Sequence, residues 1–270
     1  MQMEEPEILL RLDGGLGNLM FQIAGIKSFS QFANKSVGFT NFSHLSQQYY
    51  DLGRILFPNY RKTIFANIKE NMDFQTSVFR NSFVEPIDGY NDLGFLLNQK
   101  YSMLDNCYLQ NHNMFTSKAY VCDLFDFSNI QLSKTHQYML ENNICASMHV
   151  RRGDYVDIQN VLPCQSVSYY KTAIDAIGDY DFLFIFSDDP IWCEENLFFK
   201  NKIVIDLDEL VSMKMMAMCK KHIISNSTFS WWPAYLSNSN DVILPRTWFG
   251  PGVTTPRPID HYHVPGWVTI

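Results

Sequence analysis

Residues 145–154 read CASMHVRRGD, an apolar run that ends in two arginines, a glycine and an aspartate. A short apolar run bounded by turn-forming residues predicts a buried strand, here Cys145–Val150. Strand and helix patterns alternate from there toward the C-terminus. The predicted strands are Phe182–Phe186, Lys202–Ile205, Ile223–Ile224 and Val242–Leu244, and the predicted helices are Ser166–Ile177, Pro190–Leu197, Asp208–Cys219 and Phe229–Leu236. This alternation predicts an α/β domain with a doubly wound parallel sheet.

A second α/β pattern opens the chain. The glycine-rich turn Gly14–Gly17 separates a predicted strand, Ile8–Leu12, from a predicted helix, Asn18–Ala33. Another strand is predicted at Ser36–Thr40. The helix carries apolar or small residues at helical spacing, at Phe21, Ala24, Gly25 and Phe32. Residues 50–133 show only weak periodicity, and we expect helices and loops there.

These patterns predict two α/β domains, at 1–140 and 141–250. The last stretch, 251–270, is rich in proline, which is incompatible with regular helix, so we expect a tail that packs over the surface.

Composition excludes several classes of protein. The chain has 270 residues, with 21 Lys and Arg against 28 Asp and Glu, a formal charge of −7 that argues against a nucleic-acid partner. No apolar run approaches the roughly 20 residues that span a bilayer, although peripheral membrane association stays open. The acidic start, MQMEEPEILL, lacks the positive region of a signal peptide, so we expect a cytoplasmic protein. Six cysteines without a C-x-x-C pair predict reduced, mostly buried thiols.

Ligands of doubly wound sheets bind beyond the carboxyl ends of the strands, so the loops that follow strands are the candidate site. These loops are Gly14–Asn18, His149–Asp154, Ser187–Asp189, Asp206–Asp208 and Ser225–Thr228. The first is not a dinucleotide fingerprint, because Met20 stands where the third glycine belongs, and no P-loop motif occurs. It is either a tight turn that needs glycine or a loop that touches a ligand.

The arginine pair is the most informative of these features. Arg151 and Arg152 follow a strand, and we expect both in a loop, with Gly153 allowing the turn and Asp154 orienting one guanidinium. Guanidinium groups can bind a diphosphate in two-pronged fashion without a metal. The alternative is a surface salt bridge with Asp154.

The remaining loops allow two interpretations each. The hydroxyls and free N–H groups at 225–228 suit a phosphate, or Ser227 or Thr228 simply caps the next helix. Asp189 before Pro190 reads as a helix cap. Asp206 and Asp208 are spaced like metal ligands, but we favour a cap and predict no metal site. His149 is a base, a phosphate donor or a packed strand-end residue.

Four blocks together resemble the bacterial α-1,2-fucosyltransferases, glycosyltransferase family 11. They read RLDGGLGNLMFQ at 11–22, HVRRGDY at 149–155, SDD at 187–189 and NSTFSWW at 226–232. The resemblance implies two Rossmann-like α/β domains facing a cleft, the GT-B type. It implies transfer of L-fucose from GDP-β-L-fucose to the 2-hydroxyl of a terminal β-galactose of an oligosaccharide, with inversion and without a metal or other cofactor. One departure is Leu19, where the family pattern usually has Gln.

The resemblance also implies roles for individual residues. The first domain would lie on the acceptor side and the second would bind the GDP-sugar. Donor-binding residues would be Gly15, Gly17, Asn18, Arg151, Arg152, Ser187, Asp188, Asn226, Ser227, Thr228 and Ser230. The catalytic residues would be Asp154, His149 and Arg151, with Asp154 first as proton acceptor and Asp13 a further candidate. A transferase for another GDP-sugar or acceptor linkage, and a non-catalytic glycan-binding or nucleotide-sugar-binding module, remain as alternatives.

Overall fold

The computed structural model describes residues 6–40, 57–70, 82–84, 93–98, 102–105, 107–237, 239–254 and 258–270. The chain forms two compact units, Met1–Asn129 and Ile130–Ile270. The sequence prediction put the boundary after residue 140. The structure divides earlier because helix α5, Lys134–Asn142, contributes Leu140 to the core of the second unit.

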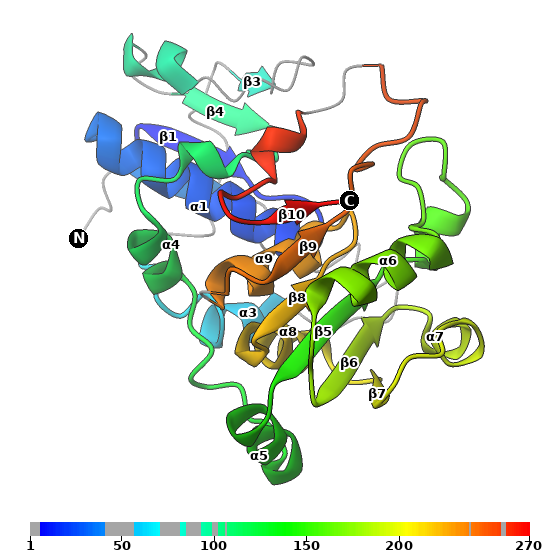
Figure 1. Ribbon diagram of the computed structural model, residues 1–270. Coiled ribbons are helices and arrows are strands. Elements are labelled where there is room, and N and C mark those ends of the chain that lie inside the picture. The colour runs from blue at the N-terminus through cyan, green and yellow to red at the C-terminus, as the bar shows by residue number, and fades with distance from the viewer. Residues whose placement is uncertain are drawn as a thin grey trace. The chain divides into compact units, whose positions relative to one another are not determined.

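The first unit contains a parallel four-stranded sheet in the order β2-β1-β4-β3 (Figure 1). Its strands are β1 Ile8–Arg11, β2 Val37–Thr40, β3 Ser82–Val84 and β4 Ser102–Asp105. The chain leaves β1 toward β2 and later returns on the other side of β1 as β4. The point where the direction reverses therefore lies between β1 and β4, which is where ligands of such sheets bind.

Helix α1, Leu16–Ala33, joins β1 to β2 and is buried over most of its length. The predicted start at Asn18 is two positions late, because Gly15 is the residue before the first turn and Gly17 lies within it. The helical spacing groups Phe32 with the apolar residues of this helix. In the structure Phe32 does not share their burial, because it is 77% exposed. The other elements are α3 Phe57–Lys62, η2 Leu93–Asn98, η3 His112–Met114 and α4 Lys118–Leu124.

The second unit contains six parallel strands in the order β10-β9-β8-β5-β6-β7. They are β5 Cys145–Val150, β6 Phe182–Ser187, β7 Lys202–Ile205, β8 Lys221–Ile223, β9 Val242–Leu244 and β10 Val268–Thr269. From β5 the chain runs outward through β6 and β7, then returns to the other side of β5 as β8. The reversal point of this sheet is the gap between the ends of β5 and β8.

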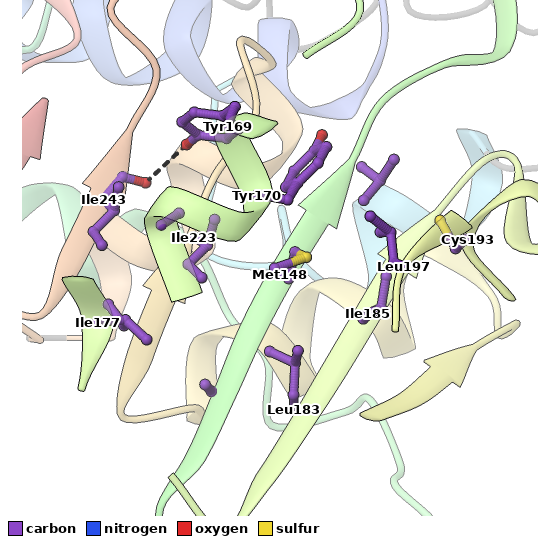
Figure 2. Packing of buried hydrophobic residues seen from close by; sticks show 13 residues of the cluster. Met148, Tyr169, Tyr170, Ile177, Leu183, Ile185, Cys193, Leu197, Ile223 and Ile243 are labelled. Carbon is purple, nitrogen blue, oxygen red and sulfur yellow. Dashed lines mark hydrogen bonds between the residues drawn. The ribbon is translucent and has the colours of Figure 1, made fainter. Parts of the chain in front are cut away.

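Helices cover both faces of this sheet, as the alternation of its strand residues requires. On one face, Tyr170 and Ile177 of helix α6 pack with Met148 and Leu183 (Figure 2). On the other face, Met215 and Met216 of α8 join Phe184 and Phe186 in a second buried cluster. The helices are α6 Val167–Ile177, α7 Pro190–Asn196, α8 Glu209–Met218 and α9 Thr228–Leu236, with short helices η4 Gly153–Val156 and η5 Ile259–His261.

The C-terminal stretch is part of the second unit's framework rather than a surface tail. β10 adds a parallel strand to β9, a pairing that the predicted surface tail at 251–270 did not include. Trp231 of α9 donates its Nε1–H to Tyr262 O at 2.7 Å, and its ring packs against Trp267. These aromatic contacts bury hydrophobic area that α9 cannot bury alone.

Two further findings concern the whole set of described residues. None of their helices is long and apolar enough to cross a membrane. All six cysteines are free thiols, four buried and two half-buried, as predicted.

Candidate active site

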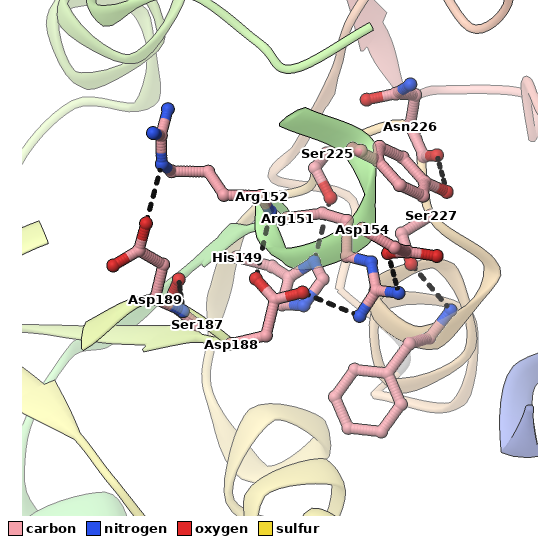
Figure 3. A network of polar contacts seen from close by, with 12 residues as sticks. His149, Arg151, Arg152, Asp154, Ser187, Asp188, Asp189, Ser225, Asn226 and Ser227 are labelled. Atoms are coloured by element: carbon pink, nitrogen blue, oxygen red, sulfur yellow. Dashed lines mark hydrogen bonds and ion pairs between the residues drawn. The ribbon is translucent and has the colours of Figure 1, made fainter. Parts of the chain in front are cut away.

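The loops after β5, β6 and β8 meet at the reversal point of the second sheet (Figure 3). His149, at the end of β5, bridges to the loop after β8 through a hydrogen bond between its Nδ1 and Ser225 Oγ at 2.8 Å. Arg151 and Arg152 lie in the loop just beyond β5, as predicted. The site residues proposed from the second half of the sequence are therefore brought together by the strand order.

His149 is a buried, neutral histidine. Burial, and then the neighbouring Arg151 charge, lower the pKa of the imidazole to about 3. The ring also packs against Phe229 at 5.5 Å between centroids. Near neutral pH the imidazole is therefore uncharged, and its Nδ1 shares a hydrogen bond with the Ser225 hydroxyl.

Arg151 is held by two carboxylates. One Nη donates to Asp154, as predicted, and the other lies 2.7 Å from Asp188 Oδ2. The guanidinium also lies over the ring of Tyr155, at 5.1 Å from its centroid. With 30% of its side chain exposed, Arg151 is oriented but still within reach of a ligand.

Arg152 extends in a different direction (Figure 3). Its Nε donates to Asp189 Oδ2 at 3.0 Å, and its guanidinium stacks on the Trp192 ring at 4.1 Å. No hydrogen bond joins either of its Nη nitrogens to another described residue. An aromatic face orients the cation without neutralising it, so Arg152 retains donors for an anion.

Asp188 ties the arginine loop to the end of β6. Its Oδ1 accepts the Arg152 backbone N–H at 2.8 Å, while Oδ2 faces Arg151. Gly153 permits this approach, because a Cβ at that position would lie 2.5 Å from Asp188 Oδ2. Ser187 supports the same turn by accepting the Asp189 N–H at 2.9 Å.

The loop after β8 leads into helix α9. Ser227 caps the helix by accepting the Phe229 N–H at 3.3 Å, and buried Ser230 donates to Ser227 O at 3.2 Å. Thr228 is half-buried at the first helical position. Asn226 is 1% exposed, and its amide is bonded to other parts of the protein.

The acidic residues considered as metal ligands have local roles. Asp208 caps α8 by accepting the Leu210 N–H at 2.9 Å, and Asp189 caps α7 by accepting the Trp192 N–H at 3.2 Å, so both cap predictions are confirmed. Asp206 is exposed at the end of β7. The described residues contain no group of three or more His, Cys, Asp or Glu side chains placed to hold a metal ion.

The glycine loop lies at the reversal point of the first sheet. Gly14 has a φ of 88°, which favours glycine, and a Cβ there would lie 2.6 Å from Asn18 Nδ2. Gly15 and Gly17 lead into α1, and Asn18 Oδ1 accepts from Gln110 Nε2 at 2.8 Å. These predicted site residues belong to the first unit, whereas the loop that carries Arg151 belongs to the second.

Asp13 and Leu19 flank this loop. Asp13 accepts the Gly14 N–H at 2.8 Å and the Tyr108 hydroxyl at 3.4 Å. Leu19 is fully buried in α1. The residue that departs from the family pattern is therefore an apolar, buried side chain.

Sequence reasoning missed two residues that shape the site. Trp192 was not singled out, although its place in the first turn after the Asp189 cap puts it next to the loop that carries Arg152. Gln165, which bonds the Asn226 amide at 2.9 Å, carried no motif at all. Its role depends on a loop conformation that no local pattern predicts.

The comparisons with known proteins agree with this architecture. Residues 8–270 match the model of Glycosyl transferase family 11. The chain is 30% identical over 290 residues to the O-antigen biosynthesis glycosyltransferase WbnK of Escherichia coli, covering 88% of this chain and 93% of that protein. It is 29% identical over 275 residues to an α-1,2-colitosyltransferase of Escherichia coli, covering 90% and 92%.

Solved structures show the same fold at low identity. A NodZ α-1,6-fucosyltransferase co-crystallised with GDP aligns with a TM-score of 0.51 at 13% identity, over 86% of this chain and 92% of that one. The fucosyltransferase NodZ from Bradyrhizobium gives a TM-score of 0.50 at 12% identity, with the same coverage. The predicted α/β fold of the GT-B type, with two Rossmann-like units, is confirmed. With the family model spanning nearly the whole chain, this protein belongs to glycosyltransferase family 11 and is a glycosyltransferase.

Proposed function

We propose that the protein transfers L-fucose from GDP-β-L-fucose to the 2-hydroxyl of a terminal β-galactose, with inversion at the fucose C1. The observation that carries this proposal is the pair of oriented guanidinium groups at the reversal point of the second sheet. Family membership and the α-1,2 linkage in a relative's name support it. The second unit would bind the GDP-sugar and the first would bind the acceptor.

The arginines supply what the leaving group needs. As the bond between C1 and the phosphate oxygen breaks, negative charge grows on the diphosphate, and preorganised cations stabilise that charge. Arg152 is stacked on Trp192 with its Nη groups unbonded within the described chain, and Arg151 is partly exposed between its carboxylates. The start of α9, with its Ser227 cap, lies on the neighbouring loop and suits a phosphate oxygen.

A single displacement also requires a proton acceptor. The acceptor oxygen bonds to C1 as the C1–phosphate bond breaks, and its proton passes to a basic group. We propose the Asp154 carboxylate for this role, because its side chain is 62% exposed and lies beside Arg151. His149 is buried, and its pKa of about 3 makes it a poor acceptor, so its proposed part is to hold Ser225 and support the donor site.

We further propose that the reaction needs no metal, because the guanidinium groups provide the positive charge at the diphosphate. A strong chelator should leave turnover unchanged. If EDTA abolishes turnover and Mn²⁺ or Mg²⁺ restores it, Asp206 and Asp208 return as ligand candidates.

A second donor is favoured by one observation, the 29% identical α-1,2-colitosyltransferase. Colitose is L-fucose without its 3-hydroxyl group. A site that hydrogen-bonds that hydroxyl would reject colitose strongly, whereas a site that leaves it unbound would accept both sugars.

The deciding experiment is a donor and acceptor screen. GDP-L-fucose and GDP-colitose are each offered with several β-galactosides, GDP release is measured, and the product linkage is determined by NMR. We expect fucosyl transfer to the 2-hydroxyl of galactose. Another linkage or preferred donor would contradict the assignment, and binding without GDP release would favour a non-catalytic module. GDP should also raise the melting temperature more than UDP does, and equal shifts would argue against a GDP-sugar.

A further inference from the structure

Asn226 lies at the junction of three loops and is almost completely buried, at 1% exposure. Its Nδ2 donates to Pro163 O and to Trp248 O, each at 3.0 Å, and its Oδ1 accepts from Gln165 Nε2 at 2.9 Å. Both partners of Nδ2 are carbonyls, which only accept, so the orientation of the amide is unambiguous. Both N–H donors of Asn226 are therefore used within the protein.

The segments that Asn226 joins also bind each other. Gly250 N donates to Val161 O at 2.9 Å, and Gly252 N donates to Asn160 O at 2.7 Å. The contact is close, because a Cβ on Gly250 would lie 2.4 Å from Asn160 O. The segment after β9 is thus held against the end of the long loop after β5, and the Asn226 amide closes the junction.

A second path leads from Asn226 to the arginine loop. Its backbone carbonyl accepts the Tyr155 hydroxyl at 3.3 Å. The Tyr155 ring in turn lies under the Arg151 guanidinium, at 5.1 Å from its centroid. A displacement of Asn226 would therefore move the support of Arg151, even though the Asn226 side chain does not contact that residue.

We propose that Asn226 is a positioning residue, which holds the loop carrying Arg151 in its anion-binding conformation and does not itself contact the donor. The family resemblance had implied a donor-binding role for Asn226. This inference rests on the proposed function in so far as the anion is a nucleoside diphosphate. Its physical basis is that removing the amide leaves two buried carbonyls unpaired, which favours another loop conformation.

The first test replaces the amide with an isosteric group that cannot donate when ionised. Asn226→Asp should weaken GDP binding, measured by titration calorimetry at pH 8, about tenfold or more. The loss relative to the parent should shrink as the pH falls, because a protonated carboxyl regains one donor for the two carbonyls. Burial raises the pKa of Tyr155, which bonds the Asn226 carbonyl, to about 12, so it stays neutral throughout. Arg151, Asp154 and Asp188 face Tyr155 in both the parent and the variant. Any effect of their charges on GDP binding is therefore common to both proteins and cancels when the two affinities are divided at each pH.

A second variant distinguishes the proposal from simple misfolding and from direct contact between Asn226 and the donor. Gln165 is half-buried, and its Nε2 donates to Asn226 Oδ1 and to Thr247 O at 3.0 Å. Gln165→Ala should weaken GDP binding about threefold or more if the junction matters. If Asn226 instead touches the donor, only Asn226→Asp weakens binding, and that result overturns the proposal. Asn142→Asp is the matched control, an exposed amide in α5 with a bond to Tyr138 O, and should bind GDP like the parent.

Hydrogen–deuterium exchange tests the junction without any ligand. The Gly250 and Gly252 amides should exchange faster in Asn226→Asp and in Gln165→Ala than in the parent. In Asn142→Asp they should exchange at the same rate as in the parent. Unchanged exchange in both junction variants overturns the proposal. If the parent fails to bind GDP, the proposed function fails, whereas the exchange result still decides whether Asn226 holds the loops.

Discussion

The carboxyl edges of the two sheets differ in how they are built. At the second edge, charged side chains are fixed by one another, because Asp188 and Asp189 orient Arg151 and Arg152. At the first edge, the loop is shaped by the backbone, with Gly14 at a positive φ directly before α1. Replacing one partner of a side-chain ion pair disturbs the backbone less than adding a Cβ to a glycine at a positive φ. We therefore expect mutations at the second edge to change chemistry and mutations at the first to change folding.

The largest effect should come from the arginine pair. Arg151→Ala or Arg152→Ala should each lower kcat/KM about 10²- to 10³-fold, or 3 to 4 kcal/mol, because a charge-assisted contact to the leaving diphosphate is lost. Lys should restore activity only in part, since it lacks the two-pronged geometry. Steady-state kinetics with GDP-fucose, after confirmation of an unchanged melting temperature, measures this. Turnover within about threefold of the parent in both Ala variants, below ~0.7 kcal/mol, would show a surface salt bridge instead.

Gly14→Ala probes the first edge. A side chain at this positive φ, only 2.6 Å from Asn18 Nδ2, should destabilise the first unit by about 1 to 3 kcal/mol, toward the upper end. Gly14→Ala in an Asn18→Ala background is the matched control, since it keeps the positive φ but removes Asn18 Nδ2, the atom nearest to the added Cβ. All five tryptophans lie in the second unit, so their fluorescence reports that unit and calorimetry is needed for the first. Equal losses in the two backgrounds would mean that the Asn18 contact contributes nothing.

The second edge should also be sensitive to pH through His149. Its folded pKa of about 3 lies below the ordinary 6.5, so the unfolded chain binds the proton first as pH falls. The stability from this site is complete above pH 6.5 and is lost progressively as the pH falls toward 3, by about 2 kcal/mol at pH 5. Urea unfolding followed by tryptophan fluorescence should show a shallower pH dependence for His149→Asn, which keeps a group near Nδ1. Parallel stability curves for parent and variant would contradict this.

The smallest expected effects come from a pair of tyrosine hydroxyls. Tyr155→Phe removes the bond to buried Asn226 O and should cost about 1 kcal/mol of second-unit stability, with a few-fold loss of GDP affinity. Tyr108→Phe removes the longer, 3.4 Å contact to Asp13 and should cost less. Denaturant titrations of both variants measure the difference. A larger loss for Tyr108→Phe would reverse the view that the first edge depends mainly on its backbone.

The second sheet could be predicted from the sequence far better than the first. Strands β5, β7 and β9 begin and end where the apolar runs do, because buried parallel strands are continuous hydrophobic stretches. β3 and β4 were missed. Each is very short, and its place in the sheet depends on long-range pairing, of β4 with β1 and of β3 with β4, and not on a local pattern. β10 escaped notice for the same reason, inside a stretch dominated by proline.

The site was predictable where chemistry and position coincide. Strand ends followed by Arg, Asp or Ser predicted the loops that meet after β5, β6 and β8, and caps such as Asp208 follow from local hydrogen bonding. What each residue does there was not predictable. Whether Asn226 bonds a ligand or three loops depends on where residues 163–165 and 248 lie, and the burial that makes His149 neutral arises only in the folded sheet.

The late position of Tyr262 and Trp267 has a consequence for synthesis. Every strand of the first sheet precedes residue 106, so that unit can form while the rest of the chain is still being translated. In the second unit, the bond from the Trp231 indole N–H to the Tyr262 carbonyl forms only after Tyr262 has left the ribosome, and β9 pairs with β10 only after β10 has been made. A nascent chain that stalls before residue 262 would expose an aromatic surface that chaperones bind, so rare codons or fusions near this end should lower the soluble yield more than changes near β1.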